Sequence, residues 1–323
     1  MTAIDLRDKS HEEWLELRNS GIGGSDIATV LGENPYKQPL ELWMEKTGKA
    51  PAADLSDNQR VEWGNRLEDI VAVAYADKTG YKVRRRNFMF TDAEYPFMLA
   101  NIDRDVVGEK RVLECKTAGA FAMRDQWGDG NLYDADGKML ALDDKVPAHY
   151  LLQTLWYMSI VKRDAGDLAA LIGGNDFRVY SFASDQEIAV LMRDAAKEFW
   201  ALVQADTPPP LDYGHASSMA LVKRLHPGCY GIKHLDASLT HWHECRREAL
   251  SKVKAYQAAA DGAKVHILEA MGSNAVGILD DGTVYSRALR KVKAREQGAY
   301  SFVSFDHRSG STAAKLIDAN TED

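Results

Sequence analysis

The chain has 323 residues, of which 45% are hydrophobic and 27% charged, a composition typical of a soluble globular protein with one large domain or two modest ones. Its net charge of -8 argues against a general basic coat for nucleic acid. Residues 213–323 hold 15 Lys and Arg against 12 Asp and Glu, so the acidic excess lies in residues 1–212. The polar first residues, the lack of a membrane-length apolar run and three cysteines without a CxxC pair lead us to expect a cytoplasmic protein with reduced thiols and no membrane contact.

Helical patterns fill the first 80 residues. Ser10 and Glu13 form a capping box for a short helix that ends near Asn19. Further helices are predicted to begin near Ser25, Pro39 and residue 57, and Gly80 ends the last of them. That last helix should bury one apolar stripe, made of Val61, Leu67, Ile70, Val71 and Ala74.

Strands and helices alternate over the next 125 residues. Strands are expected at about 81–90, 96–107 and 111–117, followed by a polar irregular segment over 124–145. Pro147 begins an apolar helix, and residues 168–182 read as a hairpin. Ser184 and Glu187 are predicted to cap a helix that runs to about Ala205.

A run of prolines divides the sequence. We predict a main domain over residues 1–206, a proline-rich linker over 207–211 and an extension over 212–323. The extension should contain a helix over about 236–271, a hairpin that turns at Asp281–Gly282, and a strand in YSFVSF. The predicted fold class is α/β, with a central mixed sheet of about five strands flanked by helices and a C-terminal α+β appendage.

Two carboxylates and a lysine are predicted to share one face of a hairpin. In ANIDRDVVGEKRVLECK, Gly108 and Glu109 fit a two-residue type II′ turn, because glycine supplies the positive φ that its first central position needs. That register sets Asp103 opposite Glu114 and Asn101 opposite Lys116. Alternation along the strands then gathers Asp103, Glu114 and Lys116 on one side.

Facing carboxylates repel each other, so this arrangement favours a cation between them. Oxygen ligands suit Mg²⁺, with Mn²⁺ as a substitute, and Lys116 beside them could hold a water or a phosphate oxygen. The alternative is an exposed hairpin with cross-strand salt bridges, in which Lys116 simply neutralises Glu114.

Four motifs extend the pattern beyond the hairpin. The segments LRNSGIGGSDIATVLGENPY, WGNRLED, ANIDRDV and LECKT occur in this order, and a helix that carries Gln153 follows them. Together they resemble the YqaJ-type viral recombinase family, which includes the lambda-type exonucleases, within the PD-(D/E)XK nuclease superfamily. The resemblance covers about residues 10–205, and it implies the restriction-endonuclease-like core of that superfamily. One departure is Ile102, which stands where many members of the family have proline.

The resemblance also implies residue roles. Asp103, Glu114 and the main-chain carbonyl of Cys115 would bind one cation, Glu68 would reach a second cation or its water, and two ions would be bound in all. Lys116 would position the attacking water. Gln153 would act in the same site, although a glutamine in LLQTLW can also serve only to satisfy a buried backbone group.

The glycine-rich segment RNSGIGGSD suggests an anion site, because glycines let a backbone approach a ligand closely and Ser25 begins a helix. The resemblance implies that Arg18 and Ser25 hold the 5′-phosphate of a DNA end, with Asn101 and Gln153 as helpers. The alternative is an ordinary tight turn with a serine N-cap.

The resemblance thus leads to a magnesium-dependent 5′-to-3′ exonuclease that acts on double-stranded DNA ends and leaves 3′ single strands for phage-type recombination, in a bacterial cell or a phage-infected host. Its implied partners are two further copies in a ring of three and a single-strand annealing protein. Two alternatives stay open, a restriction-type or junction-resolving endonuclease and a non-catalytic DNA-binding assembly protein. The basic run from Arg287 to Arg295 is expected to add DNA or partner contacts.

Overall fold

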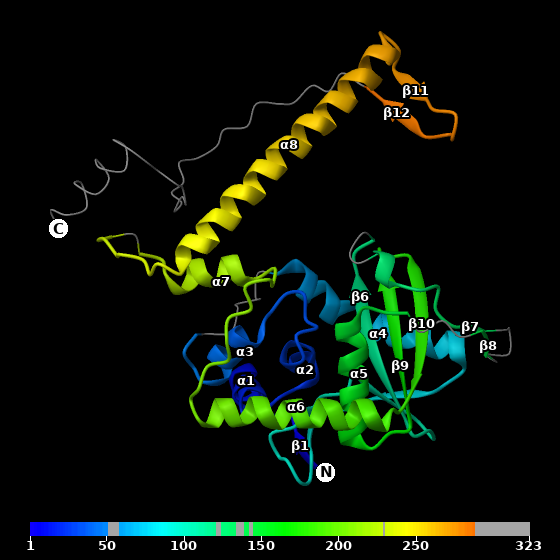
Figure 1. The fold of residues 1–323 in the computed structure, drawn as a ribbon. Helices are drawn as coiled ribbons and strands as arrows, with labels where there is room; N and C mark the ends of the chain where they lie inside the picture. Colours follow the sequence, from blue (N-terminus) through cyan, green and yellow to red (C-terminus); the bar gives the residue numbers. More distant parts are fainter. Residues whose placement is uncertain (51–57, 121–123, 134–138, 142–144, 229, 288–323) are drawn as a thin grey trace. The chain divides into compact units, whose positions relative to one another are not determined.

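The computed structural model describes residues 1–50, 58–120, 124–133, 139–141, 145–228 and 230–287. The chain divides into two compact units, Met1–Leu225 and His226–Asp323 (Figure 1). Each unit is described by itself. Of the helices in the described ranges, none combines the length and the apolar character that crossing a membrane requires.

A five-stranded mixed sheet forms the centre of the first unit, in the order β10-β9-β6-β5-β2. Only β6 and β9 run parallel, and the other neighbouring pairs are antiparallel. This confirms the predicted α/β fold with a mixed sheet. The strands are β2 (Val83–Arg85), β5 (Arg104–Val106), β6 (Arg111–Ala118), β9 (Ala165–Ile172) and β10 (Asp176–Ala183).

Helices α4 (Gln59–Thr79) and α5 (Ala148–Val161) cover opposite faces of this sheet (Figure 1). Successive residues of β6 point to opposite faces, so Leu113 packs in a cluster with Tyr75 of α4, whereas Val112 packs in another with Trp156 of α5. Burying one such side chain fully stabilises the fold by roughly 1.5–3 kcal/mol. The sheet is therefore the middle of three packed layers.

Most helix ends in the first unit follow the predicted capping signals. Ser10 and Glu13 form the capping box of α1 (His11–Asn19), and Pro39 begins α3 (Pro39–Lys46). Gly80 ends α4 with a φ of 75°. The N-cap of α6 is Asp185, not Ser184, because the Asp185 carboxylate accepts bonds from two helical N–H groups. The remaining helices here are α2 (Gly24–Val30) and α6 (Gln186–Gln204).

The predicted strand 96–107 is two strands that belong to different sheets. β4 (Leu99–Ala100) joins β1 (Thr2–Asp5) and β3 (Phe88–Thr91) in a three-stranded sheet, whereas β5 belongs to the central one. The chain changes sheets over residues 101–103. Asn101 therefore lies outside the ladder, and its predicted position opposite Lys116 is wrong.

The register of the β5–β6 hairpin is as predicted, with Arg104 opposite Leu113 and Asp105 opposite Val112. The turn itself differs from the prediction. A hydrogen bond from Glu109 N to Val106 O closes a turn in which Gly108, with a φ of 87°, is the second central residue. Positive φ at that position is typical of a type II turn, so the predicted type II′ turn at 108–109 is wrong.

The apolar stripe of α4 was predicted only in part. Val71 is buried, but Ile70 is 57% exposed and Val61 is 38% exposed. The face that packs on the sheet carries Val71, Ala72, Tyr75 and Thr79. The predicted stripe and the buried face differ by a small rotation about the helix axis, and contact with the sheet determines which residues are buried.

The first unit continues past the prolines to Leu225. The His215 ring is 2.7 Å from the carbonyl oxygen of Asn34, and Gln38 Nε2 donates to Ser218 Oγ over 2.9 Å. Leu221 of α7 (Ser218–Leu225) is buried. These contacts attach α7 to the main unit, so the compact units divide after Leu225 rather than at the predicted linker.

The second unit contains the predicted helix and hairpin. α8 (Leu239–Met271) leads to β11 (Val276–Ile278) and β12 (Val284–Ser286), which pair antiparallel around Gly282. Arg287 is the last described residue. The predicted strand YSFVSF and the rest of the basic run up to Arg295 lie outside the described residues.

Between β6 and α5, the described residues form a 3₁₀ turn, η1 (Arg124–Gln126), and a short pair of strands, β7 (Leu132–Tyr133) and β8 (Met139–Ala141). This segment was predicted to be irregular throughout.

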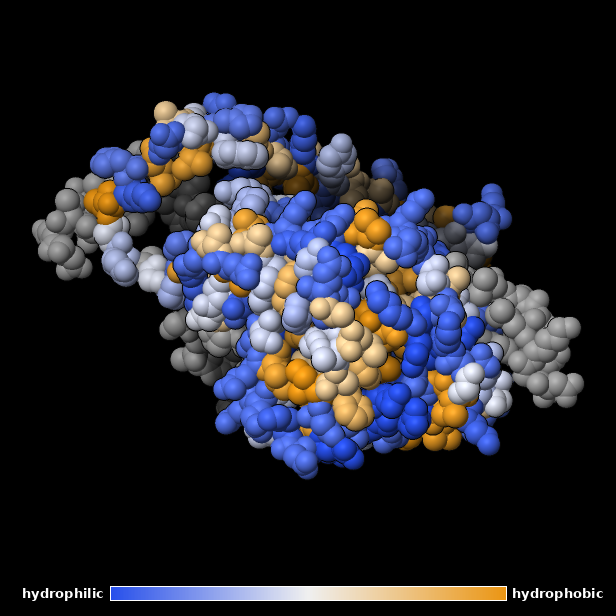
Figure 2. Space-filling view, turned by 90° about the horizontal axis from the view of Figure 1, so that it is seen from below, coloured by the Kyte–Doolittle hydropathy of each residue, from blue (hydrophilic) through white to orange (hydrophobic). Residues whose placement is uncertain are grey.

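Figure 2 shows one face of the molecule, on which hydrophilic residues surround small apolar patches. Apolar patches of that kind are ordinary on a protein surface.

Candidate active site

The β5–β6 hairpin brings Asp103, Glu114 and Lys116 together, as the sequence predicts. Lys116 Nζ lies 2.6 Å from Glu114 Oε1, and Asp103 Oδ2 accepts a hydrogen bond of 2.8 Å from the backbone N–H of Cys115. The ion pair of the alternative interpretation is thus present. It is not on an exposed hairpin, however, because the Glu114 side chain is only 2% exposed and that of Lys116 only 20%.

Glu114 is tied to α5 through a glutamine. Gln153 Nε2 donates to Glu114 Oε1 over 2.5 Å and to the Tyr157 hydroxyl over 3.2 Å. Gln153 therefore joins a side-chain network rather than a buried backbone group. The second carboxylate oxygen, Oε2, is buried and has no hydrogen-bond partner in the described part of the chain.

Burial perturbs the titration of all three charged groups. It raises the pKa of Glu114, and burial together with the Glu114 charge raises the pKa of Asp103. Burial alone would lower the pKa of Lys116, but the carboxylates of Glu114 and Asp103 outweigh it and raise that pKa. The raised pKa values mean that the single Lys116 ammonium does not fully stabilise both carboxylates in their ionised form, so a further positive charge would stabilise them.

These observations fit a bound divalent cation. A buried carboxylate oxygen without a partner is costly unless something neutralises it, and Asp103 offers a second carboxylate close enough for its charge to interact with that of Glu114. The described residues contain no ready cluster of three or more His, Cys, Asp or Glu for a metal ion. Ligands from the backbone or from water would have to complete the coordination.

Glu68 has arginine partners in this structure. Its Oε1 lies 2.5 Å from Arg104 Nη1 and 2.9 Å from Arg85 Nη2. Glu68 nevertheless lines the same pocket as Asp103 and contributes to its raised pKa. Both arginines contact Oε1, so Oε2 is the oxygen of Glu68 that could reach a cation.

Cys115 sits between Glu114 and Lys116 of β6 and points to the opposite face. Burial raises the pKa of its thiol, so the thiol stays protonated. Its backbone N–H holds the Asp103 carboxylate. The predicted role of its carbonyl oxygen stays a prediction.

The glycine-rich segment places the two predicted anion-binding residues together. Arg18 Nη2 donates to Ser25 Oγ over 2.9 Å. Beneath them, Lys46 Nζ is 2.8 Å from Asp26 Oδ2 and donates to the carbonyl oxygen of Arg18 over 2.9 Å. Asp26 also accepts a bond from the backbone N–H of Gly23. A buried ion pair thus holds the segment in shape.

Tyr157 connects this loop to the carboxylates. A Cβ built on Gly24 would lie 2.3 Å from the Tyr157 ring, so only glycine fits there. The same tyrosine accepts the hydrogen bond from Gln153, whose amide also holds Glu114. One aromatic ring therefore separates the anion loop from the carboxylate site.

The other two predicted helpers do not join the anion loop. Gln153 bonds to Glu114, and Asn101 lines the pocket that contains Glu68 and Asp103. No hydrogen bond in the described residues links either of them to Arg18 or Ser25.

Several residues near the site were missed from the sequence. Lys116 lies over the Tyr150 ring, and burial together with the Lys116 charge lowers the pKa of neighbouring His149 to about 4. Lys46 and Tyr157 were likewise not assigned to the site. Their helical spacing is that of core or surface residues, so no local signal marks them.

Comparison with known proteins finds a family to which part of the main unit is similar. Residues 13–164 match the model of the YqaJ-like viral recombinase domain, so this part of the chain is similar to that family. The match confirms the resemblance that the four motifs carry.

Among individual relatives, an uncharacterized protein YqaJ of Bacillus subtilis is 37% identical over 220 residues, which make up 67% of this chain and 64% of that protein. An uncharacterized protein R354 of Acanthamoeba polyphaga mimivirus is 28% identical over 76 residues, 24% of this chain and 14% of that protein. The chain therefore spans less than two thirds of the length of either relative.

Solved structures with a similar arrangement include an alkaline exonuclease, LHK-Exo, from Laribacter hongkongensis. It has a TM-score of 0.46 and 16% identity, over 67% of this chain and 98% of that one. A phage-related exonuclease from Haemophilus somnus has a TM-score of 0.42 and 12% identity, over 60% of this chain and 99% of that one.

Proposed function

We propose that this protein is a divalent-metal-dependent deoxyribonuclease that degrades double-stranded DNA ends in the 5′-to-3′ direction and leaves 3′ single strands for recombination. The observation that carries the proposal is that only the Tyr157 ring separates the buried carboxylate–lysine site from the Arg18–Ser25 loop. A loop that holds a terminal phosphate next to a hydrolytic site suits removal of nucleotides from an end. The YqaJ-like domain supports the same class of activity.

Asp103, Glu114 and the carbonyl of Cys115 would hold Mg²⁺ or Mn²⁺, and Glu68 would reach a second ion. Such ions lower the pKa of a bound water and neutralise charge on the phosphate. The unpartnered Oε2 of Glu114 supports this assignment.

The side chains around the carboxylates have distinct parts in the proposal. Lys116 keeps its proton, so it acts as a fixed positive charge for a phosphate oxygen or an attacking water. Gln153 fixes the carboxylate of Glu114 through its amide N–H. Arg18 and Ser25 bind the terminal 5′-phosphate.

The central test is cleavage of linear duplex DNA with Mg²⁺. The wild-type protein should release mononucleotides, and Glu114→Gln should abolish release while it preserves the shape of the side chain. DNA binding without cleavage by the wild type would instead support an assembly protein. Cutting of a covalently closed circle as fast as a linear molecule would support an endonuclease.

The 5′-phosphate assignment has its own test. Arg18→Ala should lose activity on 5′-phosphorylated ends and retain more of it on 5′-hydroxyl ends. Equal losses on both ends would contradict the role of the loop. The proposal extends to a ring of three copies and a single-strand annealing partner. Mass photometry of the full chain should then show a trimer, and a larger complex when such an annealing protein is added.

A further inference from the structure

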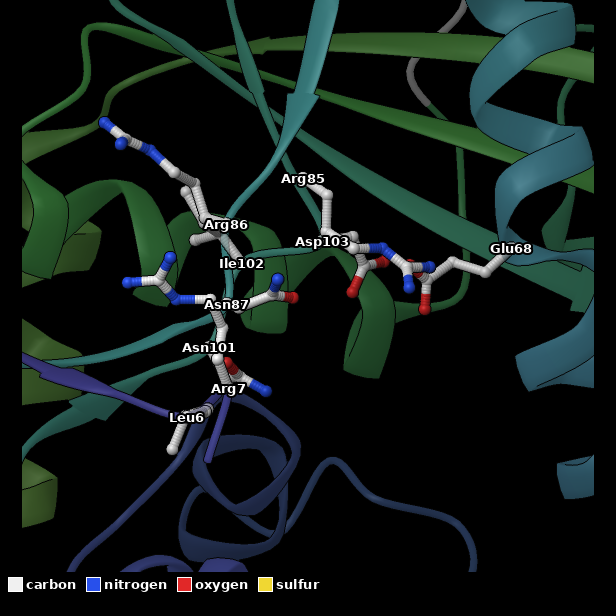
Figure 3. Close-up of a pocket in the computed structure, with 9 residues that line it drawn as sticks. All are labelled: Leu6, Arg7, Glu68, Arg85, Arg86, Asn87, Asn101, Ile102 and Asp103. Carbon is white, nitrogen blue, oxygen red and sulfur yellow. The ribbon is translucent and has the colours of Figure 1, made fainter. Parts of the chain in front are cut away.

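A pocket of about 410 Å³ opens beside the carboxylate site, between the segment that follows β1 and the segments that flank β2 and β5. Figure 3 shows Glu68, Asp103 and Arg85 at one side of it and Leu6, Arg7, Asn87 and Asn101 gathered at another. Leu6 and Arg7 precede residue 13, where the YqaJ-like domain match begins. Part of the pocket wall therefore comes from residues that lie before the matched region.

The pocket is rich in hydrogen-bond donors. Three arginines line it, Arg7, Arg85 and Arg86, and their side chains are 65%, 47% and 29% exposed. The Nε of Arg86 is buried and has no hydrogen-bond partner in the described ranges. The Asn87 and Asn101 side chains likewise form no hydrogen bond with described residues. Arg7 donates from Nε and Nη2 to the Asp5 carboxylate, and Arg85 donates from Nη2 to Glu68 and Asp69. The other guanidinium N–H groups and the two amides are suited to phosphate oxygens.

The carboxylates in the pocket wall decide where an anion would lie. Asp103 and Glu68 repel a ligand phosphate unless a cation stands between them, so phosphate oxygens are best accommodated at the Arg7 and Arg86 side. The volume lies in the range of about 300–1,000 Å³ that is usual for small-ligand sites. It therefore suits one or two nucleotides of a single strand rather than a duplex.

We infer that Arg7, Arg86, Asn87 and Asn101 bind the phosphodiester backbone of the strand being cleaved, next to the scissile phosphate. The inference rests on the proposed nuclease function. The pocket opens directly from the carboxylates that would hold the cations, and single-strand sites elsewhere use positively charged grooves to follow the backbone. Arg85, which pairs with Glu68, lies between the two regions.

The test compares Arg7→Gln/Arg86→Gln with the control Lys110→Gln. Lys110 is an exposed, ion-paired residue in the turn at the other end of the hairpin. Asp105, the partner of Arg86, keeps Arg163 at 2.8 Å and Arg84 at 3.5 Å, so loss of Arg86 does not leave a buried charge alone.

Binding is measured by fluorescence anisotropy in EDTA, with a duplex whose 5′ strand is frayed at the end, over a range of salt concentrations. The double variant should bind at least about tenfold more weakly than the control. The slope of log affinity against log salt should become shallower by about 1.4, since each single-strand phosphate contact contributes about 0.7. With Mg²⁺, KM should rise while kcat changes little.

A variant that keeps every arginine ion pair guards against a folding defect. Asn87→Asp places a negative charge in the pocket and should weaken binding in the same direction. If the wild type cleaves DNA but the pocket variants match Lys110→Gln in salt slope and KM, the inference is wrong. If the wild type does not cleave DNA, the proposed function is wrong, and unchanged salt slopes in EDTA would still reject the pocket separately.

Discussion

Lys46 is the residue whose replacement tests the anion loop most directly. Its ammonium group lies 2.8 Å from Asp26 Oδ2, with side-chain exposures of 2% and 5%, and it also holds the carbonyl of Arg18. Burial opposes ionisation of Asp26, but the charges of Lys46 and Arg18 outweigh it and lower the pKa of Asp26. Lys46→Met would leave a buried carboxylate with little compensation.

Removing one partner of a buried ion pair costs about 3–5 kcal/mol. We expect the lower end, about 3 kcal/mol, because Arg18 remains 3.9 Å from Asp26 and the Gly23 N–H still donates to it. The matched control is Lys49→Met. Lys49 pairs with Asp206 on the surface, where both are well exposed, so its loss should cost only about 0–1 kcal/mol.

Urea unfolding followed by tryptophan fluorescence measures this difference, since six of the seven tryptophans lie within the first unit. Asp26→Asn/Lys46→Met should recover part of the loss because it removes both charges. A depressed pKa contributes stability that is present above the unfolded value near 4 and lost as the pH falls through the folded value. The penalty of Lys46→Met should therefore shrink at low pH.

The second readout is the preference for 5′-phosphorylated ends, which Lys46→Met should reduce because Arg18 loses an anchor for its backbone. Two results would refute the reasoning. One is a stability loss no larger than that of Lys49→Met. The other is an unchanged end preference in a protein that is destabilised as expected.

Three further predictions follow from single features of the fold. Asp103 and Glu114 have raised pKa values, so the metal-free protein loses stability as the pH rises above their unfolded values near 4. Mg²⁺ should therefore raise Tm more at pH 8 than at pH 5. An equal rise at both pH values would argue against binding at these carboxylates. Gly80→Ala should cost about 1 kcal/mol in urea unfolding, from its φ of 75° alone, because no atom of the described residues beyond its chain neighbours and its own helix lies within 4 Å of the added methyl group. A neutral change would contradict this. Iodoacetamide should modify exposed Cys245 and spare buried Cys115, as mapped by mass spectrometry, and rapid modification of Cys115 would show that β6 opens.

Much of the local structure could be read from the residues. The capping box at Ser10, the glycine stop at Gly80 and the hairpin register around Gly108 are short-range features, each decided within a few residues. Asp103 lies directly before β5, where its carboxylate accepts from the backbone N–H of Cys115, next to Glu114. Period-two alternation is a local property, so it survives whatever else packs around the strands.

Errors arose where a local pattern allowed more than one outcome. The apolar residues of α4 cover more than one face, and contact with the sheet selected Val71 over Ile70. The residues after Leu99 continue as an extended chain, but pairing with two different sheets splits them at 101–103. Neither choice is visible without the neighbouring elements.

The site itself required both levels. Its charged residues on β6 follow from the alternation of one strand, which depends on backbone geometry alone. The partners of the charged residues in and around the site do not, since Gln153 reaches Glu114 from α5, Arg104 of β5 holds Glu68 of α4, and Lys46 meets Asp26 beneath the anion loop. Such contacts join segments 20 to 39 residues apart through packing, and packing depends on the whole sequence at once.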